Sequence, residues 1–152
     1  MIDTGDMAPD FALPSDGGQV VRLSDLRGTR VVLFFYPKDD TSGCTKEACG
    51  FRDALPAIQE RNALVIGVSP DPVRSHERFR DKYDLNFPLL ADEDHAVASA
   101  YGAWGKKKLY GREYEGILRS TFVIGEDGRV EKVYRKVRPA EHAEEIVAEL
   151  AE

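Results

Sequence analysis

The chain contains two cysteines, Cys44 and Cys49, and both lie near the start of a predicted helix. Thr41 or Ser42 is the natural N-cap of that helix, which places Cys44 in its first turn. Unpaired backbone N–H groups and the positive end of the helix dipole favour an anion at this position. We therefore expect the Cys44 thiol to ionise more easily than a free cysteine, and the thiolate is the nucleophilic form.

A second interpretation is that Cys44 is an inert, small apolar residue, which is the common fate of a cysteine in a soluble protein. The preceding Asp39 and Asp40 favour this interpretation slightly, because nearby negative charge opposes a thiolate. From the local residues alone, both a reactive and a structural Cys44 stay open.

A short apolar run leads into this segment and positions it. Residues 31–36 are apolar and mostly β-branched or aromatic, which is typical of a buried strand. Pro37 ends that strand, because it has no N–H for the ladder. The helix after Cys44 has an apolar face made of Ala48, Phe51, Leu55 and Ile58. Pro56 predicts a kink or a break of this helix near Ala54.

Strands and helices alternate along the rest of the chain. The sequence predicts buried strands at 63–68 and 121–124, an extended segment at 86–90, a half-exposed strand at 130–134, helices at 73–83 and 93–101, and a last helix that begins at Pro139. Near the N-terminus, residues 7–13 and 20–23 are expected to form a hairpin around a turn at 15–18. Alternation implies parallel pairing through right-handed crossovers. We therefore expect an α/β protein with a mixed central sheet and helices on both faces.

Composition limits the class of protein. A chain of 152 residues with 42% apolar and 32% charged residues fits one soluble globular domain. The net charge of −6 argues against nucleic acid or an anionic membrane as a partner. No run approaches the roughly 18 apolar residues of a membrane span, and nothing marks a signal peptide. We expect a cytoplasmic protein, in which a transient catalytic disulfide is more plausible than a lasting one.

Two stretches of the chain carry a family resemblance. Pro37-x-x-x-Thr41-x-x-Cys44 resembles the active-site signature of the peroxiredoxins. Its continuation, Gly-Cys-Thr-Lys-Glu-Ala-Cys-Gly-Phe-Arg, is similar to the bacterioferritin-comigratory-protein (BCP) or PrxQ branch. A second similar stretch, at residues 101–124, begins Tyr-Gly-Ala-Trp and ends Arg-Ser-Thr-Phe-Val-Ile. The resemblance covers nearly the whole chain and implies a thioredoxin-like fold with an N-terminal β-hairpin extension.

The resemblance also implies an activity for a single AhpC/TSA-type domain, residues 1–152. It is the reduction of hydrogen peroxide and organic hydroperoxides to water or alcohols, as antioxidant defence. Cys44 would attack the O–O bond and become a sulfenic acid, and Cys49 would condense with it to an intramolecular disulfide. Thioredoxin, or glutaredoxin, would reduce that disulfide by thiol exchange. This atypical two-cysteine mechanism needs no prosthetic cofactor and no metal, and the branch is often monomeric, so we expect a monomer.

Four further residues receive supporting roles from the resemblance. The Thr41 hydroxyl would donate to the thiolate or accept from the peroxide, besides its place as N-cap. Pro37 would shield Cys44 from water, besides ending the strand. Arg119 would stabilise the thiolate and polarise the peroxide; without the resemblance it is a solvated charge before a strand. Glu47 would orient Arg119 or the helix, and an exposed surface charge is its alternative role.

The spacing of the cysteines sets a condition on the implied disulfide. In an intact α-helix, residues five apart have Cα atoms roughly 8–9 Å apart and point about 140° apart around the axis. A disulfide needs Cα atoms within about 7 Å, so Cys44 and Cys49 require the helix to open. Gly50 and Pro56 both weaken the helix. We therefore predict local unwinding around Cys49 and Gly50 during turnover.

Other classes of protein use similar residues. The two cysteines could hold zinc together with His76, His95 or His142, although the spacing is not that of a usual zinc knuckle. A thiol-based redox sensor would use the same cysteine pair without high turnover. A thiol-disulfide oxidoreductase is disfavoured, because the sequence lacks a Cys-x-x-Cys pair.

Residues 102–118 are rich in Gly, Lys and Tyr and are expected to form a long loop, which in a compact domain is often functional. Its aromatic residues Trp104, Tyr110 and Tyr114 are expected to pack against the protein, and a docking surface for thioredoxin is the alternative. The run of lysines at 106–108 is expected to be solvated.

Overall fold

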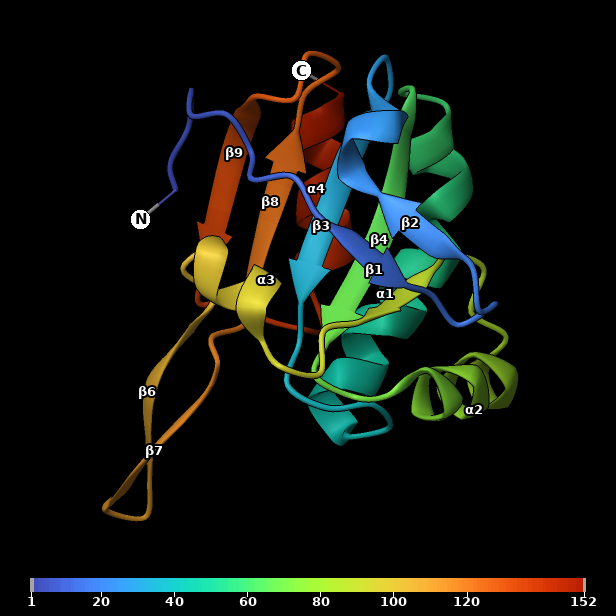
Figure 1. Cartoon of the computed structure of the whole chain (residues 1–152). Coiled ribbons are helices and arrows are strands. Elements are labelled where there is room, and N and C mark those ends of the chain that lie inside the picture. Colours follow the sequence, from blue (N-terminus) through green and yellow to red (C-terminus); the bar gives the residue numbers. More distant parts are fainter. Residues whose placement is uncertain (1, 152) are drawn as a thin grey trace.

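A five-stranded mixed sheet forms the centre of the computed structural model, which describes residues 2–151 (Figure 1). In spatial order the strands are β5 (Leu89–Ala91), β4 (Ala63–Ser69), β3 (Arg30–Phe35), β8 (Ser120–Ile124) and β9 (Val130–Arg135). β3, β4 and β5 are parallel, because helices cross over between them. β8 is antiparallel to β3, and β9 returns from β8 as an antiparallel hairpin.

Three helices contribute to the core on one side of the sheet: α1 (Ser42–Gln59), α2 (Val73–Tyr83) and α4 (His142–Leu150). In Figure 1, α1 and α4 lie behind the sheet, and α2 lies beyond its lower right end. Because side chains of a strand alternate between the two faces, Val32 and Phe34 of β3 point into this core. They pack with side chains such as Phe51 of α1 and Ile146 of α4.

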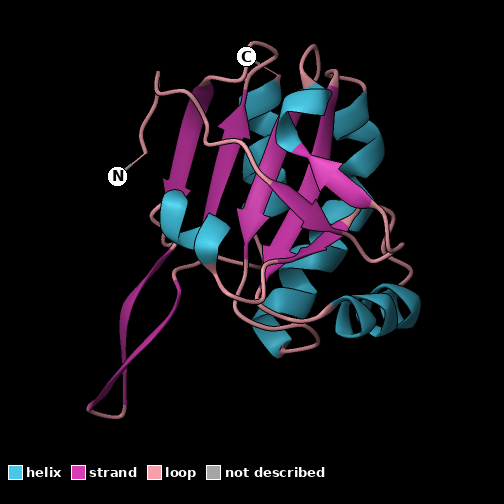
Figure 2. Ribbon diagram, viewed as in Figure 1, coloured by secondary structure: helices cyan, strands magenta, loops and turns pink. Residues whose placement is uncertain are grey.

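The N-terminal hairpin covers the opposite side of the sheet (Figure 2). It consists of β1 (Ala12–Pro14) and β2 (Val20–Arg22), followed by a 3₁₀ helix (Leu23–Leu26), and the short helix α3 (Ala96–Ala100) lies on the same side. Leu33 and Phe35 of β3 belong to this second core. The predicted α/β fold, with a mixed sheet flanked by helices and an N-terminal β-hairpin, is therefore confirmed.

Most predicted elements occur within a few residues of their predicted positions. The buried strand expected at 31–36 is β3, one residue earlier, and the helix expected at 73–83 has the bounds of α2. The helix expected at 93–101 is shorter than predicted, since only α3 is helical there. The last helix begins at His142 and not at Pro139, which lies in the preceding turn.

The predicted long loop at 102–118 is wrong. Strands β6 (Trp104–Leu109) and β7 (Arg112–Ile117) form an antiparallel hairpin that projects from the body of the protein (Figure 1). Tyr110 and Gly111 close it with φ values of 51° and 78°, a pattern typical of a two-residue hairpin turn. Glycine is common at the second position of such a turn, but a tyrosine rarely adopts the positive φ of the first. Tyr110-Gly111 is therefore only a weak turn signal in the sequence.

Helix α1 continues through Pro56 to Gln59, so the expected break does not occur. Pro56 cannot donate to the carbonyl of Arg52, one turn earlier. The side-chain amide of Asn86 donates to that carbonyl over 3.2 Å and satisfies it. A residue outside the helix thereby compensates for the proline.

No helix within residues 2–151 is long and apolar enough to cross a membrane.

Candidate active site

Cys44 lies in the first turn of α1, at the end of the loop that follows β3. Thr41, one of the two candidates that the sequence offers, is the N-cap residue, with extended φ and ψ of −92° and 157°. Its hydroxyl donates to the carbonyl of Lys38 over 2.8 Å and accepts no capping bond from the N–H groups of the helix. The Cys44 side chain is only 1% exposed, although Thr41 and Ser42 beside it are exposed. The thiol is therefore held at the protein surface without being open to bulk water.

Arg119 reaches Cys44 because of strand register. Ser120 of β8 pairs with Phe35 of β3, so the residue before Ser120 lies beside the loop that follows β3. Nη2 of Arg119 donates to Sγ of Cys44 over 3.1 Å. A guanidinium at this distance favours negative charge on the sulfur and can also donate to an oxygen placed beside it.

Glu47 fixes the orientation of the guanidinium. It lies on α1 one turn after Cys44, and its Oε1 accepts from Nη1 of Arg119 over 2.8 Å. Two nitrogens of one planar group therefore contact two residues of one helix face. Glu47 is 1% exposed, so its alternative role as an exposed surface charge does not fit the structure.

The surroundings of Glu47 and Arg119 shift the pKa values of both groups. Burial raises the pKa of Glu47 to about 7, although the charge and the hydrogen bond of Arg119 act in the opposite direction. Oε2 of Glu47 has no hydrogen-bond partner among residues 2–151. Burial lowers the pKa of Arg119, but Glu47 and Cys44 raise it more, so the pKa is above its usual value. The site combines a permanent cation with a carboxyl group that titrates near neutral pH.

Two neighbours of the site were not identified from the sequence. A Cβ atom on Gly43 would lie 3.3 Å from Nη2 of Arg119 and 3.5 Å from Cγ of Pro139, so a glycine lets the guanidinium approach the helix.

Lys107, on β6, is half-buried, unlike its exposed neighbours Lys106 and Lys108. Burial and the charge of Arg119 lower the pKa of Lys107, while Cys44 raises it. Lys107 is thus a second cation near Cys44, and the expectation of a fully solvated lysine run is wrong for it.

Cys49 lies further along the same continuous helix and is half-buried. The residue after it, Gly50, faces α4: a Cβ atom there would lie 3.2 Å from Cβ of Ala143. The structure therefore shows a second reason for a glycine at position 50, which is the close approach of α1 and α4. Pro37, expected to shield Cys44, is half-buried at the start of the loop.

The three histidines proposed as zinc ligands are engaged away from the cysteines. His76 contacts Asp39, and its other ring nitrogen lies 2.9 Å from the carbonyl of Leu90. His95 stacks on the indole of Trp104 with ring centroids 3.7 Å apart. His142 contacts Thr121 and Glu145.

Within residues 2–151, one group has three side chains close enough to share a metal ion. It consists of Asp39, Asp71 and His76, and it contains no cysteine.

Comparison with known proteins assigns the class. A model of the AhpC/TSA family matches residues 4–133. Peroxiredoxin Bcp of Bacillus subtilis (strain 168) is 48% identical over 149 residues, which cover 98% of this chain and 95% of that protein. Peroxiredoxin Bcp of Escherichia coli (strain K12) is 41% identical over 151 residues, covering 99% and 97%. These matches, and the buried Cys44 thiol that accepts a hydrogen bond from Arg119, define the protein as a thiol peroxidase of the peroxiredoxin class.

Solved structures narrow the assignment. Peroxiredoxin Q of Xanthomonas campestris has a TM-score of 0.91 and 37% identity, covering 99% of this chain and 96% of that chain. BcpB of Mycobacterium tuberculosis has a TM-score of 0.88 and 40% identity, covering 99% and 97%. The thioredoxin-like fold of a peroxiredoxin is therefore confirmed. The chain belongs to the AhpC/TSA family, and within it to the Bcp/PrxQ branch of the peroxiredoxins.

Proposed function

We propose that this chain reduces hydrogen peroxide and organic hydroperoxides with Cys44 as the peroxidatic nucleophile. The observation that carries the proposal is the 3.1 Å contact between Nη2 of Arg119 and Sγ of Cys44 in the first turn of α1. The bacterioferritin comigratory protein of Xanthomonas campestris, a solved structure 36% identical to this chain, is described as having alkyl peroxide reduction activity. This activity of a relative supports organic hydroperoxides as substrates.

The thiolate attacks one oxygen of the peroxide, the O–O bond breaks, and Cys44 becomes a sulfenic acid. The second oxygen leaves as hydroxide or alkoxide and takes a proton from solvent, which gives water or an alcohol. Arg119 donates to the reacting oxygens, so charge that develops in the transition state meets a guanidinium already in place. Glu47 acts as a positioning residue, because it holds Nη1 while Nη2 faces the sulfur.

Thr41 acts as an acceptor in this mechanism. Its one hydroxyl hydrogen is donated to the carbonyl of Lys38, so the oxygen is left to accept from the O–H of the peroxide. This favours the second of the two roles expected for Thr41. Pro37, at the other end of the same loop, limits the access of water to Cys44.

The sulfenic acid then condenses with the Cys49 thiol to a disulfide and water, after local unwinding of α1. A dithiol reductant, for which we propose thioredoxin with glutaredoxin as the alternative, reduces the disulfide by exchange. In this proposal residues 1–152 act as one domain, as a cytoplasmic monomer in antioxidant defence. The chain would be an atypical two-cysteine peroxidase.

Stopped-flow mixing of the reduced protein with hydrogen peroxide and with an organic hydroperoxide, followed by mass spectrometry, tests the proposal. We expect fast oxidation that ends in one intramolecular disulfide, abolished by Cys44→Ser. Cys49→Ser is the matched variant: it should oxidise at the same rate and stop at the sulfenic acid. A wild-type reaction no faster than that of an ordinary thiol would overturn the peroxidase mechanism and favour the redox sensor.

A further inference from the structure

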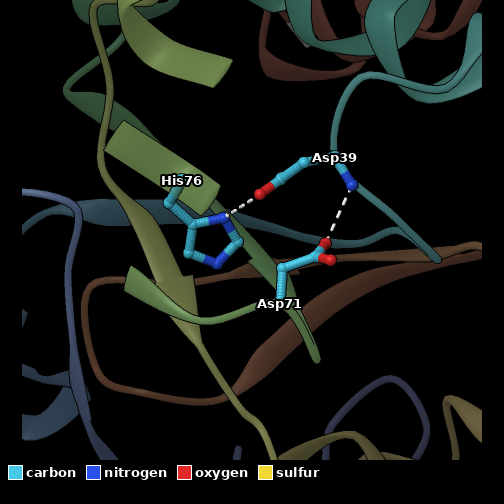
Figure 3. Close-up of side chains that lie close together, drawn as sticks. All are labelled: Asp39, Asp71 and His76. Carbon is cyan, nitrogen blue, oxygen red and sulfur yellow. Dashed lines mark hydrogen bonds and ion pairs between the residues drawn. The ribbon is translucent and has the colours of Figure 1, made fainter. Parts of the chain in front are cut away.

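The loop between β3 and α1 is attached to α2 through a buried carboxylate, that of Asp39 (Figure 3). Its Oδ1 accepts from the hydroxyl of Tyr36 over 2.6 Å. Its Oδ2 lies 2.8 Å from the hydroxyl of Ser75 and 2.7 Å from Nδ1 of His76. The backbone N–H of Asp39 donates to Oδ2 of Asp71 over 2.8 Å. We call these five residues the Asp39 network.

The geometry of His76 places a proton inside this network. Nε2 of His76 lies 2.9 Å from the carbonyl oxygen of Leu90, which can only accept, so Nε2 carries a hydrogen. Nδ1 lies 2.7 Å from a carboxylate oxygen of Asp39, and a contact this short needs a second hydrogen between them. The two side chains are therefore joined by a hydrogen bond. Because His76 is fully buried, water does not compete for this bond.

Hydrogen bonds account for the network without a cation. Asp39, Asp71 and His76 have ligand atoms within 4.8 Å of one another, a spacing that a metal ion also accepts. Both oxygens of Asp39 already face protein donors, and Oδ2 of Asp71 accepts from the hydroxyl of Ser69 as well as from Asp39. The arrangement is that of a satisfied polar network, which fixes its members in one geometry.

The next residue, Asp40, attaches the same loop to α2 a second time. Asp40 adopts a φ of 59°, which an aspartate tolerates but does not prefer. Its carboxylate accepts from Nζ of Lys82 and from the hydroxyl of Tyr83, each over 2.8 Å, at the far end of α2. Asp39 and Asp40 are thus bonded to opposite ends of one helix. The next residue is Thr41, whose hydroxyl is oriented by Lys38 on the other side of these attachments.

We propose that the Asp39 network is a positioning unit for the peroxide step: it holds the Lys38–Thr41 turn and the start of α1 in place while α1 opens around Cys49. This inference rests on the proposed function. It predicts that the network matters for oxidation of Cys44, which needs a preformed geometry, and not for formation of the disulfide, which needs movement. Asp39 and His76 act through Thr41 and Cys44 and contact neither the peroxide nor the thiol.

Two variants of Asp39 separate geometry from charge. Asp39→Ala removes the acceptor of three hydrogen bonds, and we expect the second-order rate of Cys44 oxidation to fall about 10- to 100-fold, as for a reacting group displaced by about 1 Å. Asp39→Asn restores the geometry: its Oδ1 accepts from Tyr36, and its amide donates to Ser75 and to Nδ1 of a neutral His76. We expect Asp39→Asn to oxidise within a few-fold of wild type.

The experiment follows both steps in stopped flow, oxidation by hydrogen peroxide and then disulfide formation, with Asp81→Asn as the control, since Asp81 is an exposed partner of Arg80 on the same helix. We expect Asp39→Ala to slow oxidation only. Ser75→Ala removes one donor without disturbing the helix and should slow oxidation by a smaller factor, so the test stands even if Asp39→Ala does not fold.

Three results would overturn the inference: wild-type oxidation in both Asp39→Ala and Ser75→Ala, equal slowing of both steps, or an Asp39→Asn variant as slow as Asp39→Ala. The third result would mean that negative charge is required, and not the hydrogen-bond geometry. An inert wild-type protein would instead overturn the proposed function itself, so the two failures are distinguishable.

Discussion

The two cysteines lie on one helix in contrasting surroundings. The Cys44 end of α1 is fixed by directed bonds: Arg119 contacts its sulfur, and the preceding loop is bonded to both ends of α2 through Asp39 and Asp40. Around Cys49, Gly50 lies against Ala143 of α4 through small apolar groups, which bury little area and cost little to separate. The following residues are held more firmly, because Phe51 is buried in the core and Arg52 donates to the carbonyl of Tyr83 over 2.6 Å. The difference confines the expected opening to the turn around Cys49 and Gly50.

Removal of the cation at the fixed end should have the largest effect. Arg119→Ala deletes both bonds that link Cys44 and Glu47. We expect the second-order rate of Cys44 oxidation to fall by about 10²- to 10³-fold, the usual cost of losing a preorganised donor to a developing charge. Stopped-flow oxidation measures this, with Arg112→Ala on the exposed hairpin strand as the control. A loss below tenfold would show that Arg119 holds the helix and takes no part in the reaction.

The second largest effect is the pH dependence that Glu47, near the Cys44 end of α1, gives to the free energy of unfolding. The pKa of Glu47 is about 7 in the folded protein against 4.5 for a free group. The folded state keeps the proton where the unfolded state has lost it, so the free energy of unfolding falls as pH rises from about 4.5 through 7. Between pH 4.5 and 7, we expect the free energy of unfolding of the wild type to fall by about 3 kcal/mol relative to that of Glu47→Gln. Urea unfolding at several pH values measures the difference, and parallel curves for the two proteins would contradict it.

The movable end is tested through Gly50. An alanine favours the helix by about 1 kcal/mol over glycine, which should slow disulfide formation about fivefold and prolong the sulfenic acid. Gly50→Ala alone would also press on Ala143, since the new Cβ lies 3.2 Å from it. The matched pair is therefore Ala143→Gly against Gly50→Ala/Ala143→Gly, followed by quenched-flow mass spectrometry. Equal rates of disulfide formation in this pair would sink the idea that α1 unwinds at Gly50.

The sequence predicted the central sheet because its strands are apolar runs whose character does not depend on distant residues. It also placed Cys44 in the first turn of a helix, because either candidate N-cap, Thr41 or Ser42, begins the helix just before it. The hairpin of β6 and β7 was not predicted from the sequence. A tyrosine at positive φ lies in its turn, and its strands expose most of their side chains. Local periodicity carries no signal for such a ribbon.

The surroundings of the site depended on contacts that no local pattern encodes. Arg119 could be placed beside Cys44 only through resemblance, because the register of β8 against β3 brings them together. The reservation that Asp39 and Asp40 oppose a thiolate assumed that their carboxylates face the sulfur, whereas both are bonded to α2. A buried glutamate beside an arginine, as at Glu47, likewise depends on packing and cannot be distinguished from a surface charge in the sequence.

The smallest effect should come from the far half of α1, beyond the region expected to open. Asn86→Ala removes the amide that satisfies the Arg52 carbonyl freed by Pro56, and should lower the free energy of unfolding by about 1 kcal/mol. Oxidation of Cys44 and formation of the disulfide should both stay within twofold of wild type, since unwinding is confined to the turn around Cys49 and Gly50. Paired urea unfolding and stopped-flow measurements check this. Faster disulfide formation in Asn86→Ala would show that the opening extends to Pro56, and that the stable part of the helix is only its first turn.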